Sequence, residues 1–144
     1  MKKGFTLIEV IVVLAIISTI FAFSTTSTRY YKKINRNVEI ENFLVSFKHL
    51  ITEGKVEAIN CEKDLNIVIE NENKKIKLMN KESEINYICM PKYINLIKNK
   101  NINISSKGQA VASTTILENI EDKERYNITI RVGVDYINIE KIKI

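Results

Sequence analysis

The sequence predicts an α+β fold in which the second half of a long N-terminal helix packs against an antiparallel β-sheet. Three patterns predict it: an apolar run at residues 5–23, an amphipathic stripe from Ile40 to Ala58, and alternating apolar residues beyond Leu65. A helix with one apolar stripe and a sheet with one apolar face bury these surfaces against each other. With 144 residues, the chain suffices for one small domain plus a segment outside its core.

The apolar run at residues 5–23 is the first element of the predicted helix. A helix of this length spans about 28 Å, close to the thickness of a bilayer's hydrocarbon core. Its single charged residue is Glu9. An ionised side chain in such a segment costs about 2.5–3.5 kcal/mol at mid-bilayer and needs a positive partner. We therefore interpret Glu9 as a functional residue.

The helix is expected to continue with a different pattern to about Asn60. Ser24–Thr28 is a run of weak helix formers without Pro or Gly, so a kink near Thr25–Thr28 stays open. Gly54 lies within the apolar stripe that follows, where it costs about 1 kcal/mol of helix propensity but permits close backbone approach. His49 falls off the stripe and is expected at the surface. The stripe consists of Ile40, Phe43, Leu44, Phe47, Leu50, Ile51, Gly54 and Ala58.

Alternation with period two predicts the strands. They are expected around residues 65–69, 76–78, 85–89, 102–104, 115–117, 128–132 and 137–139. Gly133–Asp135 is a predicted hairpin turn between the last two strands. Ile142 and Ile144 break the alternation, which suggests a bulge or the end of pairing. Lys98–Asn101 is expected to be a solvated loop.

The stretch Lys3–Val10, with the sequence Lys-Gly-Phe-Thr-Leu-Ile-Glu-Val, resembles the leader and N-terminus of type IV pilins and pseudopilins. The resemblance implies that a prepilin peptidase cuts between Gly4 and Phe5 and that Phe5 is then N-methylated. It also implies that Glu9 meets the N-terminal amine of a neighbouring subunit. A carboxylate in apolar surroundings recovers its desolvation cost only by such pairing. Glu9 is thus expected to act in assembly and not in catalysis.

The same resemblance implies a division into three segments. Residues 1–4 would be the leader, 5–27 the transmembrane or filament-core half of the helix, and 28–144 a pilin-like globular head. The expected location is the cytoplasmic (inner) membrane, as a single-pass protein, and then an extracellular filament. The expected partners are other pilin or pseudopilin subunits, the prepilin peptidase and the inner-membrane assembly platform. Two alternatives are an ordinary signal peptide, cleaved near Ala22–Phe23–Ser24, and a plain single-pass anchor.

The distal half resembles the H-type minor pseudopilins of type II secretion and related minor pilins. The resemblance rests on the order of Gly54–Ile59, Ser106–Ala110 and Thr115–Leu117, followed by a two-strand ending. It implies a structural and minor subunit, while the choice among pilus, competence and secretion machines stays open.

A DNA- or surface-binding tip subunit is the alternative function. Some relatives that take up DNA carry basic residues at the final hairpin turn. Here that turn holds Asp135, with Arg131 before it and Lys141 and Lys143 after it. The formal net charge is +5 and falls when Lys2 and Lys3 are removed with the leader. A phosphate-binding role is therefore weakly supported.

The remaining reactive residues predict no enzyme, no cofactor and no metal site. Cys61 and Cys89 could form a disulfide outside the cytoplasm or be two buried free thiols. Two cysteines with the single histidine, His49, do not make a structural zinc site. No phosphate-binding glycine loop or nucleophile–base arrangement occurs. An acidic cluster that lacks the spacing of an EF-hand is interpreted as a turn; it comprises Glu118, Glu121, Asp122 and Glu124.

Overall fold

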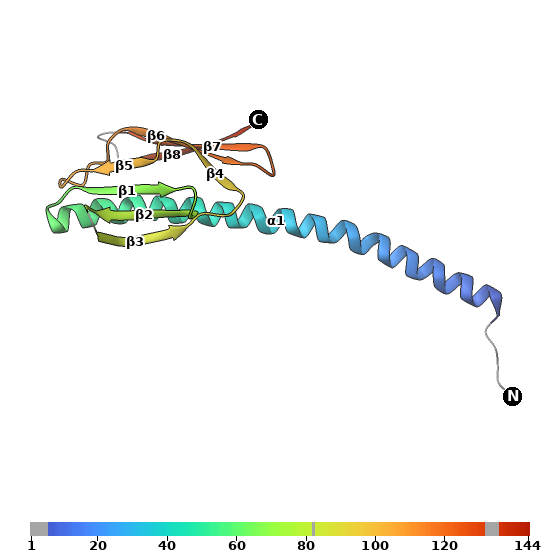
Figure 1. The fold of residues 1–144 in the computed structure, drawn as a ribbon. Helices are drawn as coiled ribbons and strands as arrows, with labels where there is room; N and C mark the ends of the chain where they lie inside the picture. Colours follow the sequence, from blue (N-terminus) through green and yellow to red (C-terminus); the bar gives the residue numbers. More distant parts are fainter. Residues whose placement is uncertain (1–5, 82, 132–135) are drawn as a thin grey trace. The chain divides into compact units, whose positions relative to one another are not determined.

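A computed structural model describes residues 6–81, 83–131 and 136–144, without the side chains of residues 23–27 and 29. One helix, α1 (Leu7–Cys61), is followed by eight strands (Figure 1). The strands are β1 (Leu65–Glu70), β2 (Lys75–Asn80), β3 (Ser83–Cys89), β4 (Ile94–Lys98), β5 (Asn101–Ile104), β6 (Ser113–Asn119), β7 (Glu124–Ile130) and β8 (Ile137–Lys143). The chain divides into two compact units, residues 1–39 and 40–144, which are described separately.

The first unit consists of the N-terminal part of α1. Thr6 precedes the helix and accepts the backbone N–H of Val10 at 3.3 Å. Helical structure continues through residues 25–28, so the weak helix formers do not end α1 there. The predicted long helix is confirmed.

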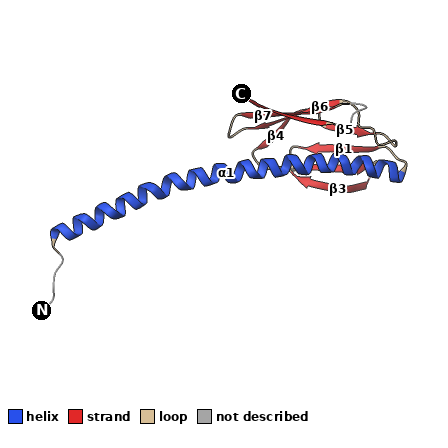
Figure 2. Cartoon of the chain, turned by 180° about the vertical axis from the view of Figure 1, so that it is seen from behind, coloured by secondary structure: helices blue, strands red, loops and turns tan. Residues whose placement is uncertain are grey.

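The second unit places residues 40–61 of α1 beside two four-stranded antiparallel sheets (Figure 2). Sheet A has the strand order β3-β2-β1-β5, and sheet B has the order β4-β6-β7-β8. All pairings are antiparallel, with register shifts only in the β2–β3 and β4–β6 pairs of the described strands. The predicted α+β fold is confirmed, although the apolar strands form two sheets where one was expected.

The core of the second unit forms where the apolar stripe of α1 meets alternate residues of the strands. Every residue of the predicted stripe is buried. Gly54 lies where the helix approaches sheet A closely: a Cβ atom there would be 2.8 Å from Cδ1 of Ile104 and 2.9 Å from Cδ1 of Leu78. These distances are well below ordinary carbon–carbon contact, about 3.5–4.0 Å. The expectation that Gly54 permits close approach is therefore confirmed.

The turn between β1 and β2 joins the two sheets. Lys74 adopts a positive φ of 50° in this turn. Its ammonium group donates hydrogen bonds to the backbone oxygen of Ile94 at 2.7 Å and to the side-chain oxygen of Asn95. The Oδ1 atom of Asn71, in the same turn, accepts the backbone N–H of Leu96 at 3.2 Å. Burial lowers the pKa of Lys74. The first hairpin of sheet A is thus fastened to β4 of sheet B.

Four details differ from the sequence expectations. β4 was not predicted, and β3 begins in a segment that looked wholly polar. Of the acidic cluster, only Glu121 and Asp122 lie in the turn at residues 120–123, because Glu118 belongs to β6 and Glu124 to β7. The predicted bulge near Ile142 is wrong, since β7 and β8 pair in one register from Ile130–Ile137 to Glu124–Lys143. The predicted hairpin turn at residues 133–135 lies outside the described residues.

Candidate assembly site

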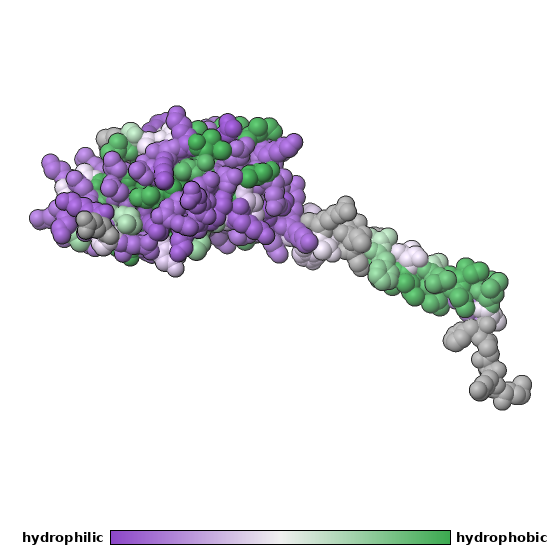
Figure 3. All heavy atoms as spheres, viewed as in Figure 1, coloured by the Kyte–Doolittle hydropathy of each residue, from purple (hydrophilic) through white to green (hydrophobic). Residues whose placement is uncertain are grey.

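The N-terminal part of α1 exposes an apolar surface. Every described side chain from Leu7 to Ala22 is exposed, including Leu7 (81%), Ile8 (70%) and Phe21 (68%). Figure 3 shows apolar residues covering this part of the chain, whereas polar residues dominate the visible face of the second unit. A contiguous apolar surface of this kind marks a site of contact with protein or lipid.

Glu9 lies at the beginning of this apolar surface, where it caps the helix. Its Oε2 atom accepts hydrogen bonds from the backbone N–H and from the hydroxyl of Thr6, each at 2.8 Å. The Thr6 hydroxyl in turn accepts the backbone N–H of Glu9 at 3.4 Å. This is a capping box, in which Thr6 and Glu9 satisfy otherwise unpaired donors of the first turn. Among the described residues, Oε1 of Glu9 has no hydrogen-bond partner.

Gly4 and Phe5, the predicted processing residues, lie outside the described residues. Cleavage between them and methylation of Phe5 therefore stay predictions. Within the described part of the chain, no helical segment has both the length and the hydropathy needed to cross a bilayer.

The two cysteines are neither joined in a disulfide nor buried in this structure, the two states expected from the sequence. Cys61 and Cys89 are free thiols in this structure, and both are exposed. The Cys61 thiol donates a hydrogen bond to Glu57 at 3.1 Å, which raises its pKa. His49 is exposed, as expected. Among the described residues, no three His, Cys, Asp or Glu side chains are grouped so as to hold a metal ion.

A buried ionic cluster in sheet B escaped the sequence analysis. Glu124 is only 8% exposed. Its Oε2 atom accepts the Tyr126 hydroxyl at 2.8 Å and forms an ion pair with the Lys141 ammonium, also at 2.8 Å. Desolvation of the Tyr126 hydroxyl, followed by its bond to Glu124, raises the pKa of Tyr126. The alternation of Glu124 with Tyr126 and Ile128 on the core side of β7 was the available signal.

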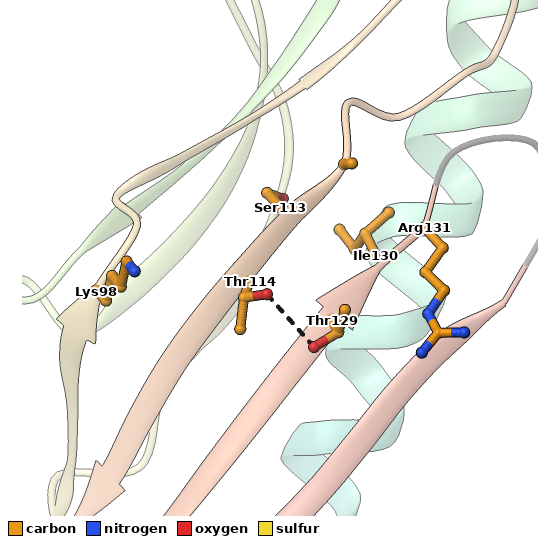
Figure 4. A pocket seen from close by; sticks show the side chains of 7 residues that line it. Lys98, Ser113, Thr114, Thr129, Ile130 and Arg131 are labelled. Carbon is orange, nitrogen blue, oxygen red and sulfur yellow. Dashed lines mark hydrogen bonds between the residues drawn. The ribbon is translucent and has the colours of Figure 1, made fainter.

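The described basic residues near the C-terminal hairpin have different surroundings. The Glu124 ion pair offsets the charge of Lys141, and Asp135 lies outside the described residues. An open pocket of about 470 Å³ lies nearby, lined by Lys98, Ala112, Ser113, Thr114, Thr129, Ile130 and Arg131. Figure 4 shows the Thr114 and Thr129 hydroxyls bonded to each other, at 3.5 Å, with Lys98 and Arg131 on opposite sides of them. The two cations therefore do not converge on one point.

Comparison with known proteins found one matching sequence motif and one similar fold. A family model of the prokaryotic N-terminal methylation motif matches residues 1–25. No curated protein matches the sequence. Among solved structures, the minor pseudopilin EpsH from the type 2 secretion system of Vibrio cholerae has a similar fold, with a TM-score of 0.51 and 12% identity. The similarity covers 72% of this chain and 95% of that one. The chain thus carries an N-terminal methylation motif, and its fold is similar to that of a minor pseudopilin.

Proposed function

We propose that this protein is a structural, minor subunit of a type IV pilus or pseudopilus, matured by a prepilin peptidase and assembled through the N-terminal part of α1. The observation that carries the proposal is the position of Glu9: one carboxylate at the beginning of a helix whose described side chains from Leu7 to Ala22 are all exposed. Such a surface is suited to packing against equivalent helices. The similarity to a minor pseudopilin supports the minor role.

The proposed chemistry of assembly is an ion pair. Cleavage between Gly4 and Phe5 would create a new N-terminal amine, one residue before the Thr6 cap of the helix. Thr6 engages Oε2 of Glu9 and leaves Oε1 to accept the amine of a neighbouring subunit. Charge-assisted hydrogen bonds of this type are about twice as strong as neutral ones, and apolar surroundings strengthen them further. Before assembly, the apolar segment would hold the subunit at the inner membrane, beside the assembly platform.

Replacement of Glu9 tests this proposal. Glu9→Ala is expected to leave the protein in the membrane fraction but to reduce its incorporation into filaments at least tenfold, measured by quantitative immunoblotting of sheared filaments. Thr6→Val is the matched control, because it removes the capping hydroxyl but keeps the carboxylate. Mass spectrometry of the mature chain should identify N-methylphenylalanine at Phe5.

Two results would contradict the proposal. One is a mature chain that begins near Thr25, which would indicate an ordinary signal peptide. The other is equal loss of incorporation in Glu9→Ala and Thr6→Val, because Glu9 would then act only as a helix cap.

A further inference from the structure

A cluster of basic residues follows the apolar surface in the first unit. Lys32 and Lys33 are exposed, and Arg36 is partly buried. Residues three and four apart are neighbours on the surface of a helix, so these three side chains, called the basic cluster below, share one face of α1. The sequence places Arg29 at the same spacing, three and four residues before the two lysines. Positive charge is thus concentrated on one side of this segment.

The folding of α1 does not explain the basic cluster. Among the described residues, the ammonium groups of Lys32 and Lys33 have no ion pair and no hydrogen bond. The sequence has no Asp or Glu within four residues of either lysine. Like charges three or four residues apart destabilise a helix. The charge of the two lysines is therefore available to a negative partner outside this chain.

Two tyrosines lie between the apolar surface and the basic cluster. Tyr30 and Tyr31 are 67% and 65% exposed. Tyrosine is enriched at membrane–water interfaces, because its ring is apolar and its hydroxyl contacts water and headgroups. The order along α1 is thus apolar, aromatic and basic. A helix that leaves a bilayer meets hydrocarbon, interface and charged headgroups in this same order.

The spacing agrees with the dimensions of a bilayer. Lys32 follows Ala22, the end of the apolar surface defined above, by ten residues, which is about 15 Å along a helix. The headgroup layer is about 5–8 Å deep on each side of the hydrocarbon. Helical side chains lean toward the N-terminus, and a lysine stem follows apolar surface while its ammonium group stays in water. The ammonium groups are thus within reach of the lipid phosphates.

We propose that the basic cluster binds the phosphate groups of anionic phospholipids, in the leaflet next to it, before the subunit enters a filament. The inference rests on the proposed function, in which the apolar surface lies in the membrane. Attraction to an anionic leaflet increases binding about fivefold for each Lys or Arg near the membrane surface. A zwitterionic headgroup has no net charge and offers no such gain. Anionic lipids should therefore gather around residues 30–36.

Fluorescence quenching by brominated lipids tests this lipid preference in the full-length protein. The chain contains no Trp, and Tyr31→Trp adds one that keeps the interfacial chemistry. The protein is reconstituted in phosphatidylcholine vesicles in which bromine is carried either by added phosphatidylglycerol or by part of the phosphatidylcholine. At low salt, phosphatidylglycerol is expected to be preferred over phosphatidylcholine at least fivefold. In 1 M salt, where the Debye length is about 3 Å, the preference should fall below twofold.

Removal of charge assigns the preference to the basic cluster. Lys32→Gln/Lys33→Gln, made in the Tyr31→Trp protein, should lower the preference for phosphatidylglycerol at least threefold. Lys32→Arg/Lys33→Arg should keep the preference, because it keeps both charges. The matched control is Lys48→Gln/Lys63→Gln, which removes the same charge at two exposed residues of the second unit. This control should leave the preference unchanged.

The outcomes separate this inference from the proposed function. Equal quenching by the two brominated lipids, or an equal loss of preference in Lys32→Gln/Lys33→Gln and in the control, would overturn the inference alone. If Lys32→Gln/Lys33→Gln keeps the lipid preference but is not incorporated into filaments, the partner of the basic cluster is a protein, and the inference is again overturned. Absence of quenching by either lipid would show that the apolar surface is not in the membrane, which would contradict the proposed function as well.

Discussion

The substitution Gly54→Ala measures how tightly α1 is seated on sheet A. A Cβ atom at this position would lie 2.8 Å from Cδ1 of Ile104 and 2.9 Å from Cδ1 of Leu78. Both side chains are fully buried, so their ends cannot rotate into solvent. Overpacking of a core costs about 1–3 kcal/mol, whereas Ala in place of Gly returns about 1 kcal/mol of helix propensity. We expect Gly54→Ala to lower the free energy of unfolding by about 1 kcal/mol.

The measurement is urea unfolding of the detergent-solubilised full-length protein, followed by near-ultraviolet circular dichroism. The chain contains no Trp, so the buried rings of Tyr93 and Tyr126 report on the second unit. Ser46→Ala, at an exposed position of the same helix, is the control, since only helix propensity changes there. It should stabilise the protein slightly.

A double-mutant cycle decides the cause. Ile104→Val alone removes the Cδ1 atom and should cost about 0.5–1.5 kcal/mol. In Gly54→Ala/Ile104→Val, the new methyl group occupies the vacated space. The double variant should therefore lose at least about 0.5 kcal/mol less unfolding free energy than the two single variants lose together. Two outcomes would refute the close approach as the reason for Gly54. One is that the losses of unfolding free energy in the two single variants simply add in the double variant. The other is that Gly54→Ala stabilises the protein by the full gain in helix propensity, about 1 kcal/mol.

Two further predictions follow from the pKa shifts. The pKa of Tyr126 is raised by burial and by its bond to Glu124, so the folded state keeps a proton that the unfolded state loses above about pH 10. Stability should therefore fall as the pH rises from 9 to 11, and Tyr126→Phe should reduce the fall; equal urea midpoints of wild type across this range would disprove it. Because the Glu57 carboxylate raises the pKa of the Cys61 thiol, Glu57→Gln should increase the thiolate fraction of Cys61 at neutral pH and speed its reaction with a disulfide reagent. An unchanged rate would show that the hydrogen bond does not control this thiol.

The helix and its buried stripe were predictable because the 3.6-residue period of an α-helix also sets the spacing of the apolar residues. Residues spaced three and four apart between Ile40 and Ala58 must share a face, whatever they pack against. The capping box at Thr6 and Glu9 was also visible as a pattern, but Glu9 was interpreted only through its charge. The capping box satisfies backbone N–H groups of Thr6 and Glu9. The hydropathy of the side chains does not show whether such backbone groups need a partner.

The division into two sheets could not be predicted, because alternation identifies a strand but not its neighbour. β4 was missed since Ile94 and Leu96 alternate only briefly, and the exposed Ile97 interrupts the pattern. The ionic cluster around Glu124 was missed for a related reason. Its Lys141 partner lies on β8, and only the β7–β8 register brings the two side chains together.

The hydrogen bonds from Lys74 to Ile94 and Asn95 have a consequence for the cooperativity of unfolding. Its ammonium group binds the backbone of Ile94, so opening the first hairpin of sheet A would strip a partly buried cation of its acceptors on β4. Loss of such a bond is costly unless both sides are released together. The two sheets should therefore open as one unit, and the slowest amide protons of β1 and β6 should exchange with a common free energy.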